Sequence, residues 1–448
     1  MADDFDLIVL GGGSGGLAGA FRAAAHGARV ALLEPSALGG TCVNVGCVPK
    51  KAMWLAAEVA GKLRQAQTLG FAVEAAPLDW STFIAHRQRY IHNIHASYRR
   101  RLEESGIAVL PVRGTLIDAG RVRCSDGVVL QAANILIATG GHAFKPDMPG
   151  AELGGTSDDF FQWTQAPPRV AIVGGGYIAV ELAGVLQALG SRVELFVRGP
   201  RLLEGFDTEI TELLTEDYRQ QGIVCHFSQP VTALHASGEQ VEVGVGEARS
   251  GAFDAVLFAT GRRANVDGLG LEPLGVALDE KRRIAVDARH ATSVAGVHAV
   301  GDVTDNPALT PVAIAAARRL MDRLYGARRG NLLDLNSLPT VAFSHPPLAQ
   351  VGLTEAAARE QHGEAVHVYR TSFRPMLHAL ADSPQRSLFK LVCVGEHRHV
   401  VGLHLLGEAA DEMLQGFAVA IRRGITLEDL QDTIAIHPTS AEEVVLLR

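Results

Sequence analysis

Cysteine, positive charge and long hydrophobic runs are all scarce in this chain of 448 residues. Five cysteines are too few to form the framework of a disulfide-rich fold, and their number is odd. Acidic residues outnumber basic ones by 49 to 41, and this net charge of −8 provides no basic field for a nucleic acid backbone. No apolar run approaches the roughly 18 residues that a membrane span needs. We therefore expect no nucleic acid partner and no membrane segment.

The start of the chain and the cysteine content both favour the cytoplasm. The first six residues include Asp3, Asp4 and Asp6 and lack the basic region that opens a secretory signal. In a reducing compartment, a cysteine pair is more often catalytic or metal-binding than structural. We expect a cytoplasmic protein whose cysteines, where they matter, carry out chemistry.

Glycine is abundant, and its first cluster lies in an informative context. A short apolar strand at 7–10 runs into a Gly-x-Gly-x-x-Gly segment, followed by a helix-compatible stretch and a second strand that ends at Glu34. Such glycines permit a tight turn and close approach of a pyrophosphate, which the helix amino terminus attracts. Glu34 stands where a carboxylate accepts a hydrogen bond from a ribose hydroxyl. The expected contacts of this loop are Gly11, Gly13, Ser14, Gly15 and Gly16.

The same unit occurs a second time. A strand at 169–173 leads into Gly-x-Gly-x-x-Ala at 174–179, then a helix through Leu189 and a strand at 192–197. Two dinucleotide folds in one chain imply two dinucleotides. The expected contacts of the second loop are Gly174, Gly176, Tyr177 and Ile178.

The remaining segments complete a three-part organisation. Ala-Thr-Gly follows an apolar strand at both 138–140 and 259–261, where we expect the chain to cross between domains. A strand at 297–300 is expected to complete the first sheet, and alternating runs beyond about residue 336 indicate an α+β domain. The predicted fold class is α/β, with two Rossmann-like dinucleotide-binding domains and a C-terminal α+β domain for dimerisation.

Cys42 and Cys47 lie close together in a glycine-rich segment. They could be two small buried hydrophobic residues or part of a zinc site, but no other ligand cluster completes four ligands, so we expect no metal. A redox disulfide is favoured, because it also explains two nucleotide folds. Pro49, Lys50 and Lys51 indicate a helix whose dipole and lysines stabilise a thiolate at Cys47.

Taken together, these segments resemble the class I flavoprotein disulfide reductases, and most closely the glutathione reductases. The resemblance runs essentially end to end. It implies a FAD-binding domain (1–140), an NAD(P)-binding domain (141–262), a central domain that completes the first (263–335) and an interface domain (336–448). The segments that carry it are 39–51, 176–184, 343–347, 411–415 and 437–443.

The resemblance implies a two-stage reaction. NADPH reduces FAD, and the flavin reduces the Cys42–Cys47 disulfide, with Cys47 next to the flavin. Cys42 then attacks the disulfide of the substrate, glutathione disulfide, by thiolate exchange. His437, oriented by Glu442, acts as acid and base on the cysteines of the other subunit, so a homodimer with shared active sites is implied.

Further roles follow from the resemblance alone. Lys50 and Glu181 match an ion pair beside the reactive nitrogen of the flavin, and Tyr177, on the same helix face as Glu181, matches the cover of the nicotinamide pocket. Asp302 and Arg262 match contacts to the ribityl chain and the diphosphate, and Thr310 is expected to cap a helix that points at the flavin. Other expected cofactor contacts are Thr41, Thr115, Thr139, Gly140 and Gly261. The expected substrate contacts are Ser14, Tyr98, Thr310, Arg318, Met376, His437, Thr439, Glu442 and Glu443.

The internal repeat favours NADPH over NADH. Glu34 lies 23 residues after Gly11, and the residue 23 after Gly174 is Val197, followed by Arg198. Loss of the acid and gain of a cation favour a 2′-phosphate. Glutathione reductases usually have a second arginine where this chain has Glu204, and Arg201 is an alternative cation.

The substrate allows alternatives. Phe21 stands where some relatives place an arginine for a glycine carboxylate. Reduction of a related disulfide (of the glutathione amide, lipoamide or trypanothione type) therefore stays open. A non-catalytic flavin-binding scaffold is disfavoured, because the chain retains Cys42, Cys47, His437 and Glu442.

Overall fold

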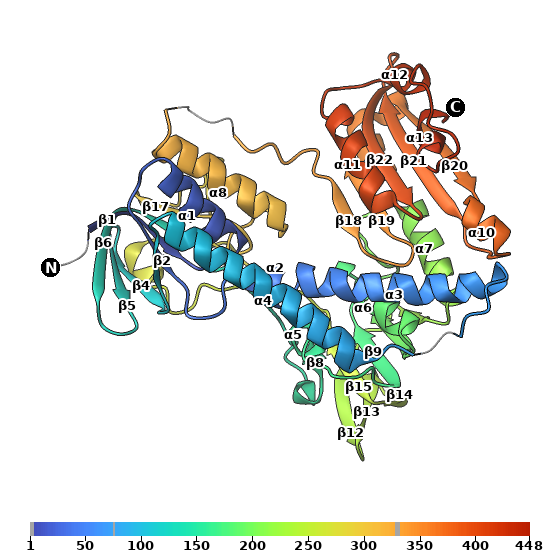
Figure 1. The fold of residues 1–448 in the computed structure, drawn as a ribbon, viewed down its shortest axis with the longest axis horizontal. Coiled ribbons are helices and arrows are strands. Elements are labelled where there is room, and N and C mark those ends of the chain that lie inside the picture. The colour runs from blue at the N-terminus through green and yellow to red at the C-terminus, as the bar shows by residue number, and fades with distance from the viewer. Residues whose placement is uncertain (1–3, 75–76, 328–331) are drawn as a thin grey trace. The chain divides into compact units, whose positions relative to one another are not determined.

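The computed structural model describes residues 4–74, 77–327 and 332–448, traced in Figure 1. The chain divides into two compact units, the first drawn from 1–52, 81–144 and 261–333 and the second from the remaining segments. Two of the boundaries between them fall at 144/145 and 260/261. The first boundary lies four residues after the Ala-Thr-Gly segment at 138–140, and the second lies within the one at 259–261. Both segments were expected to mark crossings between domains.

The first unit contains a seven-stranded sheet with the order β3-β2-β1-β6-β5-β4 and β17 beside β6. β1, β2, β3, β6 and β17 run parallel, so the strand expected near 297–300 does join this sheet. Leu7 to Leu10 are almost completely buried without alternation, as in a parallel strand covered on both faces. The bounds are β1 Asp4–Leu10, β2 Val30–Leu33, β3 Ala108–Leu110, β4 Gly114–Asp118, β5 Arg121–Cys124, β6 Val129–Ile137 and β17 Val297–Ala299.

Helices α1 (Ser14–Ala25) and α8 (Thr310–Leu324) lie side by side (Figure 1) and share one hydrophobic core with β1. Thr310 is the first residue of α8, and Leu309 holds the N-cap position. The prediction that Thr310 caps this helix is therefore wrong by one residue. Pro311 is tolerated because the first-turn N–H groups have no partner within a helix. The first unit also contains α2 Gly40–Asn44, β7 Gly141–Ala143, β16 Arg262–Ala264 and η2 Glu272–Leu274. Helix α3 Cys47–Thr68 begins in the first unit and continues into the second from residue 53, and α4 Trp80–Glu104 belongs to the first unit from residue 81.

The second unit contains its own parallel sheet, in the order β11-β10-β9-β15-β8. Helix α6 begins directly after the second glycine loop, and α7 follows the loop after β10. This sheet therefore repeats the strand–helix–strand unit of the first. The bounds are η1 Ala151–Leu153, β8 Gly155–Thr156, α5 Ser157–Phe160, β9 Arg169–Val173, α6 Tyr177–Ala188, β10 Arg192–Val197, α7 Thr208–Gln220, β11 Val224–Phe227, β12 Ala233–Ser237, β13 Gln240–Val245, β14 Ala248–Phe253 and β15 Ala255–Phe258.

The C-terminal part of the second unit is the expected α+β domain. Its antiparallel sheet has the order β18-β19-β22-β21-β20, and α11 packs its buried residues Leu414 and Ala418 against this sheet. The bounds are β18 Thr340–Ala342, β19 Leu348–Gly352, α9 Glu355–His362, η3 Gly363–Ala365, β20 Val366–Phe373, α10 Met376–Leu380, β21 Ser387–Val394, β22 His399–Leu406, α11 Ala410–Ile421, α12 Leu427–Gln431 and α13 Glu442–Val445. Among the helices of residues 4–74, 77–327 and 332–448, none is both long and apolar enough to cross a bilayer.

Candidate active site

The two cysteines of the predicted redox pair face one another across the junction of two helices. Cys42 is half-buried within α2, and Cys47 is exposed as the first residue of α3. Gly46 makes the tight junction possible, because a Cβ there would lie 2.7 Å from the carbonyl oxygen of Thr41. The backbone N–H of Lys50 donates to the Gly46 carbonyl at 2.9 Å and so begins the ladder of α3.

The surroundings of the two thiols are unequal. A hydrogen bond with Cys47, followed by burial, raises the pKa of Cys42 well above its ordinary range, although the hydroxyls of Thr310 and Ser14 act in the opposite direction. Cys47 lies at the amino end of a 22-residue helix, where the dipole favours a thiolate. Its sulfur is 3.7 Å from Oγ1 of Thr310. The arrangement therefore favours negative charge on Cys47 and a proton on Cys42.

Asn44, which the sequence analysis missed, braces the segment between the cysteines. Its amide nitrogen donates to the carbonyl oxygens of Leu38 at 3.2 Å and Gly40 at 2.9 Å. Its amide oxygen accepts from Nε2 of His95 in α4 at 2.8 Å. The only sequence signal was an amide inside the cysteine motif, because its partner His95 is 51 residues away.

The first glycine loop has the shape of a phosphate cradle. Gly11 has φ +104°, and a Cβ there would lie 2.5 Å from the carbonyl oxygen of Ala138. A Cβ on Gly13 would meet nothing closer than 3.8 Å, so the backbone is open there. Gly13 is also the N-cap of α1 and supplies no side-chain cap, which leaves the first N–H groups of that helix available to an anion.

A cavity of about 750 Å³ opens beside this loop, at the carboxyl ends of β1 and β2. Glu34 lines it and accepts hydrogen bonds from the backbone N–H groups of Gly12 at 2.7 Å and Ser36 at 2.8 Å. Thr115 and Thr139 also line it, and their hydroxyls donate to main-chain carbonyls of the segment 265–268. Its volume lies within the usual range of about 300–1,000 Å³ for small-molecule sites, and its lining suits the adenosine end of a dinucleotide.

Three further expected cofactor contacts lie together in the first unit. Nε of Arg262 is 3.6 Å from a carboxylate oxygen of Asp302, and the guanidinium donates to Thr41 Oγ1 at 3.3 Å. It also donates to the carbonyl oxygen of Gly141. Gly140 and Gly261 immediately precede the paired strands β7 and β16. The arrangement offers a cation and a carboxylate within one site.

The second glycine loop repeats the first. Gly174 has φ +141°, and a Cβ on Gly176 would meet nothing within 4 Å. Tyr177, the first residue of α6 and followed by Ile178, is 46% exposed. Glu181, one turn further along the helix, is buried, and its carboxylate accepts a hydrogen bond from the backbone N–H of Phe343 at 2.9 Å. Lys50 belongs to the first unit and Glu181 to the second, so their expected ion pair stays a prediction.

The structure separates the roles of the two arginines near the end of β10. Arg198 is exposed, directly after the strand. The guanidinium of Arg201 instead donates to the carbonyl oxygens of Phe206 at 3.1 Å and Glu204 at 2.6 Å, and to Thr211 Oγ1 at 3.2 Å. Arg201 therefore fastens its own loop, which leaves Arg198 as the better candidate for a 2′-phosphate.

The expected substrate contacts are divided between the units: Ser14, Tyr98, Thr310 and Arg318 in the first, and Met376, His437, Thr439, Glu442 and Glu443 in the second. Burial and the neighbouring Cys42 raise the pKa of Tyr98, which places this phenol within the electrostatic field of the cysteine pair. Phe21 packs partly buried against the core of the first unit, and the Arg101 guanidinium lies 4.6 Å from its ring centroid. Arg101 thus brings a cation next to Phe21.

His437 and Glu442 form a pair within the C-terminal domain. Nδ1 of His437 lies 2.9 Å and 3.2 Å from the two carboxylate oxygens of Glu442. The histidine side chain is 79% exposed and the glutamate side chain only 13%, so a held carboxylate orients an accessible imidazole. Glu443 accepts from the hydroxyl of Thr371 at 3.5 Å. Within the described residues, no group of three or more His, Cys, Asp or Glu is arranged to hold a metal ion.

Two glycine-loop folds and a helix-end cysteine pair define a dinucleotide-dependent disulfide oxidoreductase, and the family comparison agrees. Residues 5–317 match the pyridine nucleotide-disulphide oxidoreductase family, and residues 338–448 match the dimerisation domain of that family. The chain belongs to this family. It is similar to the glutathione reductase of Yarrowia lipolytica, with 42% identity over 99% of each chain. It is also 42% identical to the glutathione reductase of Schizosaccharomyces pombe, over 99% of this chain and 98% of the relative.

Proposed function

We propose that this chain is an NADPH-dependent, FAD-containing reductase of glutathione disulfide that works as a homodimer in the cytoplasm and maintains the reduced thiol pool. The observation that carries the proposal is the Cys42–Cys47 pair at the amino end of α3. The similarity to two glutathione reductases along almost the whole chain supports the substrate.

The two dinucleotides take separate places in the proposal. Residues 1–140, completed by 263–335 and by Arg262 just before them, hold FAD on the first glycine loop, Glu34 and the group formed by Thr41, Arg262 and Asp302. Residues 141–262 hold NADPH on the second loop, with Arg198 on the 2′-phosphate. Bound FAD supplies the transfer of reducing equivalents from NADPH to the Cys42–Cys47 disulfide. The open backbone at Gly13 and Gly176 and the cavity lined by Glu34 support this assignment.

The residues of the chain then carry out thiol–disulfide exchange. The imidazole of His437 takes the proton of Cys42, whose raised pKa keeps it protonated in the resting dithiol. The Cys42 thiolate attacks one sulfur of glutathione disulfide, a mixed disulfide forms, and the departing glutathione thiolate takes the proton from the imidazolium. The Cys47 thiolate next attacks the Cys42 sulfur, which forms the Cys42–Cys47 disulfide and releases the second glutathione as a thiolate that takes its proton from water.

The acid–base group is proposed to come from the second subunit. His437 lies in the region that matches the dimerisation domain, and Ile434 and Ile436 just before it are 93% and 74% exposed. Large apolar side chains so exposed are typical of an interface. In the homodimer, the partner's His437 serves the cysteine pair of this chain.

A related γ-glutamyl disulfide is the second candidate substrate. Phe21 cannot bind the glycine carboxylate of a substrate. A substrate whose glycine carboxylate is amidated has no such charge and does not require a cation at residue 21. Arg101 over the Phe21 ring favours glutathione disulfide itself, because the guanidinium provides a cation at that place.

Initial rates at 340 nm test the function with NADPH or NADH against glutathione disulfide, its amide, lipoamide and trypanothione disulfide. We expect fast turnover with NADPH and glutathione disulfide, loss of at least about a thousandfold in Cys42→Ser, and full activity in the control Cys225→Ser. Intact turnover in Cys42→Ser would refute the proposal. A preference for another disulfide would assign the substrate to the second candidate.

Coexpression of Cys42→Ser with His437→Ala tests the shared sites. If each site combines residues of two subunits, a mixed dimer retains one complete site, and random mixing restores about a quarter of the wild-type activity. If each subunit carries its own site, every site in the mixture lacks one group and no activity returns.

A further inference from the structure

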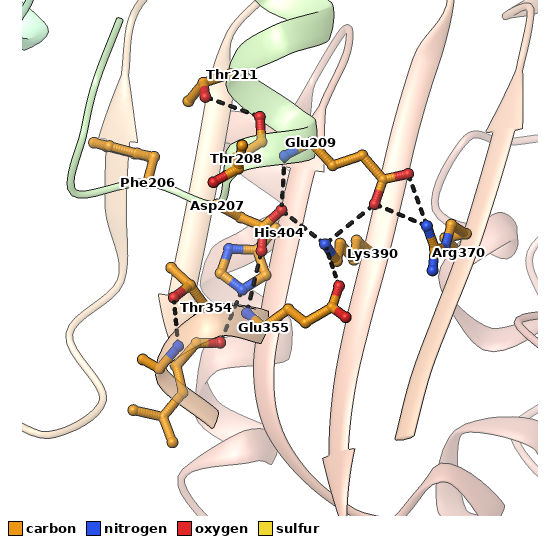
Figure 2. Close-up of polar contacts among 12 residues, drawn as sticks. Phe206, Asp207, Thr208, Glu209, Thr211, Thr354, Glu355, Arg370, Lys390 and His404 are labelled. Carbon is orange, nitrogen blue, oxygen red and sulfur yellow. Dashed lines mark hydrogen bonds and ion pairs between the residues drawn. The ribbon is translucent and has the colours of Figure 1, made fainter. Parts of the chain in front are cut away.

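A buried lysine, Lys390, lies at the centre of an ion cluster in the second unit (Figure 2). None of the residues expected to take part in catalysis belongs to this cluster. Lys390 of β21 has a side chain only 4% exposed. Its ammonium group lies 2.9 Å from Asp207, 2.8 Å from Glu355 and 3.1 Å from Glu209. An ammonium group has three donors, so these three carboxylates satisfy it completely.

The charges of the cluster balance. Glu209 also binds Arg370, with both carboxylate oxygens 3.2 Å from the guanidinium, and Glu355 binds Arg359 at 2.8 Å. Three cations therefore meet three carboxylates. Burial lowers the pKa of Lys390, but the hydrogen bonds of Glu355 and Asp207 outweigh burial, so the pKa is raised and the lysine stays charged. Removal of Lys390 would leave buried negative charge without its partner.

Asp207 is the member of the cluster that connects to the nucleotide fold. One oxygen accepts from Lys390 and from the backbone N–H of Glu209 at 3.2 Å, which caps α7. The other accepts from the backbone N–H of Glu355 at 3.1 Å, at the start of α9. Figure 2 shows Asp207 between these partners, with the buried His404 beside it. One carboxylate thus joins α7 of the nucleotide fold to the C-terminal sheet.

The loop 198–206 connects Asp207 to the end of β10. Its Leu203 has φ +50°, which is strained for a residue with a side chain and persists only where the surroundings hold it. The backbone N–H of Leu203 donates to the carbonyl oxygen of Gly175 at 2.8 Å, inside the second glycine loop. The Arg201 guanidinium donates to the carbonyl oxygens of Leu203, Glu204 and Phe206 and to Oγ1 of Thr211, and so links this part of the loop to α7. The loop that ends at Asp207 is therefore bound both to α7 and to the second glycine loop, and it begins at Arg198.

We propose that Lys390 is a positioning residue for the pyridine nucleotide: by holding Asp207, it fixes the loop that presents Arg198 and supports Gly175. This inference rests on the proposed NADPH site but assigns a distant residue of the C-terminal domain to it. It predicts that the cluster influences nucleotide affinity without touching the nucleotide or the disulfide.

The test compares Lys390→Gln with the control Arg370→Gln, which removes a cation of the same cluster whose side chain is 53% exposed and does not contact Asp207. In Lys390→Gln we expect the KM for NADPH and the Kd for 2′,5′-ADP to rise about tenfold. The kcat at saturating NADPH and the KM for glutathione disulfide should change less than about twofold. Lys390→Arg, which keeps the charge, should recover most of the affinity, and Arg370→Gln should leave it unchanged.

A lower melting temperature of Lys390→Gln with unchanged affinity for NADPH and 2′,5′-ADP would overturn the inference, because the cluster would then be structural only. If Lys390→Gln does not fold, Asp207→Asn replaces it, since asparagine still caps α7 but binds the ammonium more weakly. The same rise in the Kd for 2′,5′-ADP is expected for that variant, and an unchanged Kd overturns the inference. Binding of 2′,5′-ADP needs no disulfide, so a wild-type protein that binds it without reducing glutathione disulfide would refute the proposed function alone.

Discussion

The two glycine loops have nearly the same backbone, but different side chains cover them. In the first, a Cβ on Gly12 would lie 3.0 Å from the side chain of Glu34, and in the second a Cβ on Gly175 would lie 2.6 Å from that of Val197. Glu34 and Val197 therefore occupy equivalent places at the ends of β2 and β10. The backbone provides a general dinucleotide cradle, and the side chain at this one place changes what it can recognise.

The loops also differ in what holds them. In the first, Glu34 accepts directly from the N–H of Gly12, so an adjacent strand end organises the loop. In the second, Leu203 donates to Gly175, and the loop that contains Leu203 is anchored by Asp207 to Lys390. The first cradle is thus held locally and the second through the C-terminal domain. This difference predicts that distant substitutions affect the second nucleotide more than the first.

The largest expected effect comes from alanine at the first glycine of each loop. Gly11→Ala and Gly174→Ala would place a Cβ 2.5 Å and 2.4 Å from a carbonyl oxygen, at positive φ. We expect Gly11→Ala to lose flavin absorbance, whereas Gly174→Ala keeps it, is reduced by dithionite and loses at least about a hundredfold in kcat/KM for NADPH. Gly61→Ala, in an open part of α3, is the control. Equal effects of both variants on flavin would contradict the division between the folds.

The stability of the two units should depend differently on pH. Burial lowers the pKa of His290 to about 4 and that of His298 in the same direction, so both are neutral when folded. Below pH 6.5 these histidines bind protons in the unfolded chain but stay neutral in the folded chain. The free energy of unfolding therefore falls toward pH 4, by about 3 kcal/mol for His290 alone. In the second unit burial likewise lowers the pKa of His345, to about 4, and those of His378 and His404, but it raises that of Asp217 to about 7. A buried carboxyl with a raised pKa gains stability as pH falls, so the two effects oppose one another there.

Thermal unfolding between pH 7 and pH 5, monitored by flavin fluorescence and by circular dichroism, tests this difference. The transition of the first unit, which releases flavin, should move to lower temperature more steeply than that of the second. His290→Gln should reduce the steepness. Parallel shifts of both transitions would show that the buried histidines do not control acid stability.

The smallest of the three effects concerns the side chain after Val197. Arg198→Ala should raise the KM for NADPH about tenfold or more and leave that for NADH within about twofold, because only the 2′-phosphate requires the cation. Arg192→Ala, at the opposite end of β10, is the matched control. Equal losses with both nucleotides would mean that Arg198 supports the loop and does not read the phosphate.

Several features of the site were predictable from the sequence, because the residues that form them lie a few positions apart or occur in a repeated motif. The glycine loops and the Cys42–Cys47 pair follow from short spacings, and the contact of His437 with Glu442 was expected from the family resemblance. The helix at 310 was also expected, and its start differs by one residue only. Sequence spacing cannot reveal the hydrogen bond between Asn44 and His95, because the two residues lie on separate helices that come together only in the folded chain.

Local sequence determined the two strand–glycine–helix units, because backbone conformation at a tight turn depends on which few residues lack a Cβ. It also determined the cysteine pair at a helix end. Only the tertiary structure decided that Arg201 is engaged by its own loop, that Arg101 lies over Phe21 and that Lys390 holds Asp207, 183 residues away. A buried charge is stable only where folding brings opposite charges to it, and an apolar strand such as Ser387–Val394 carries no local sign of where they will come from.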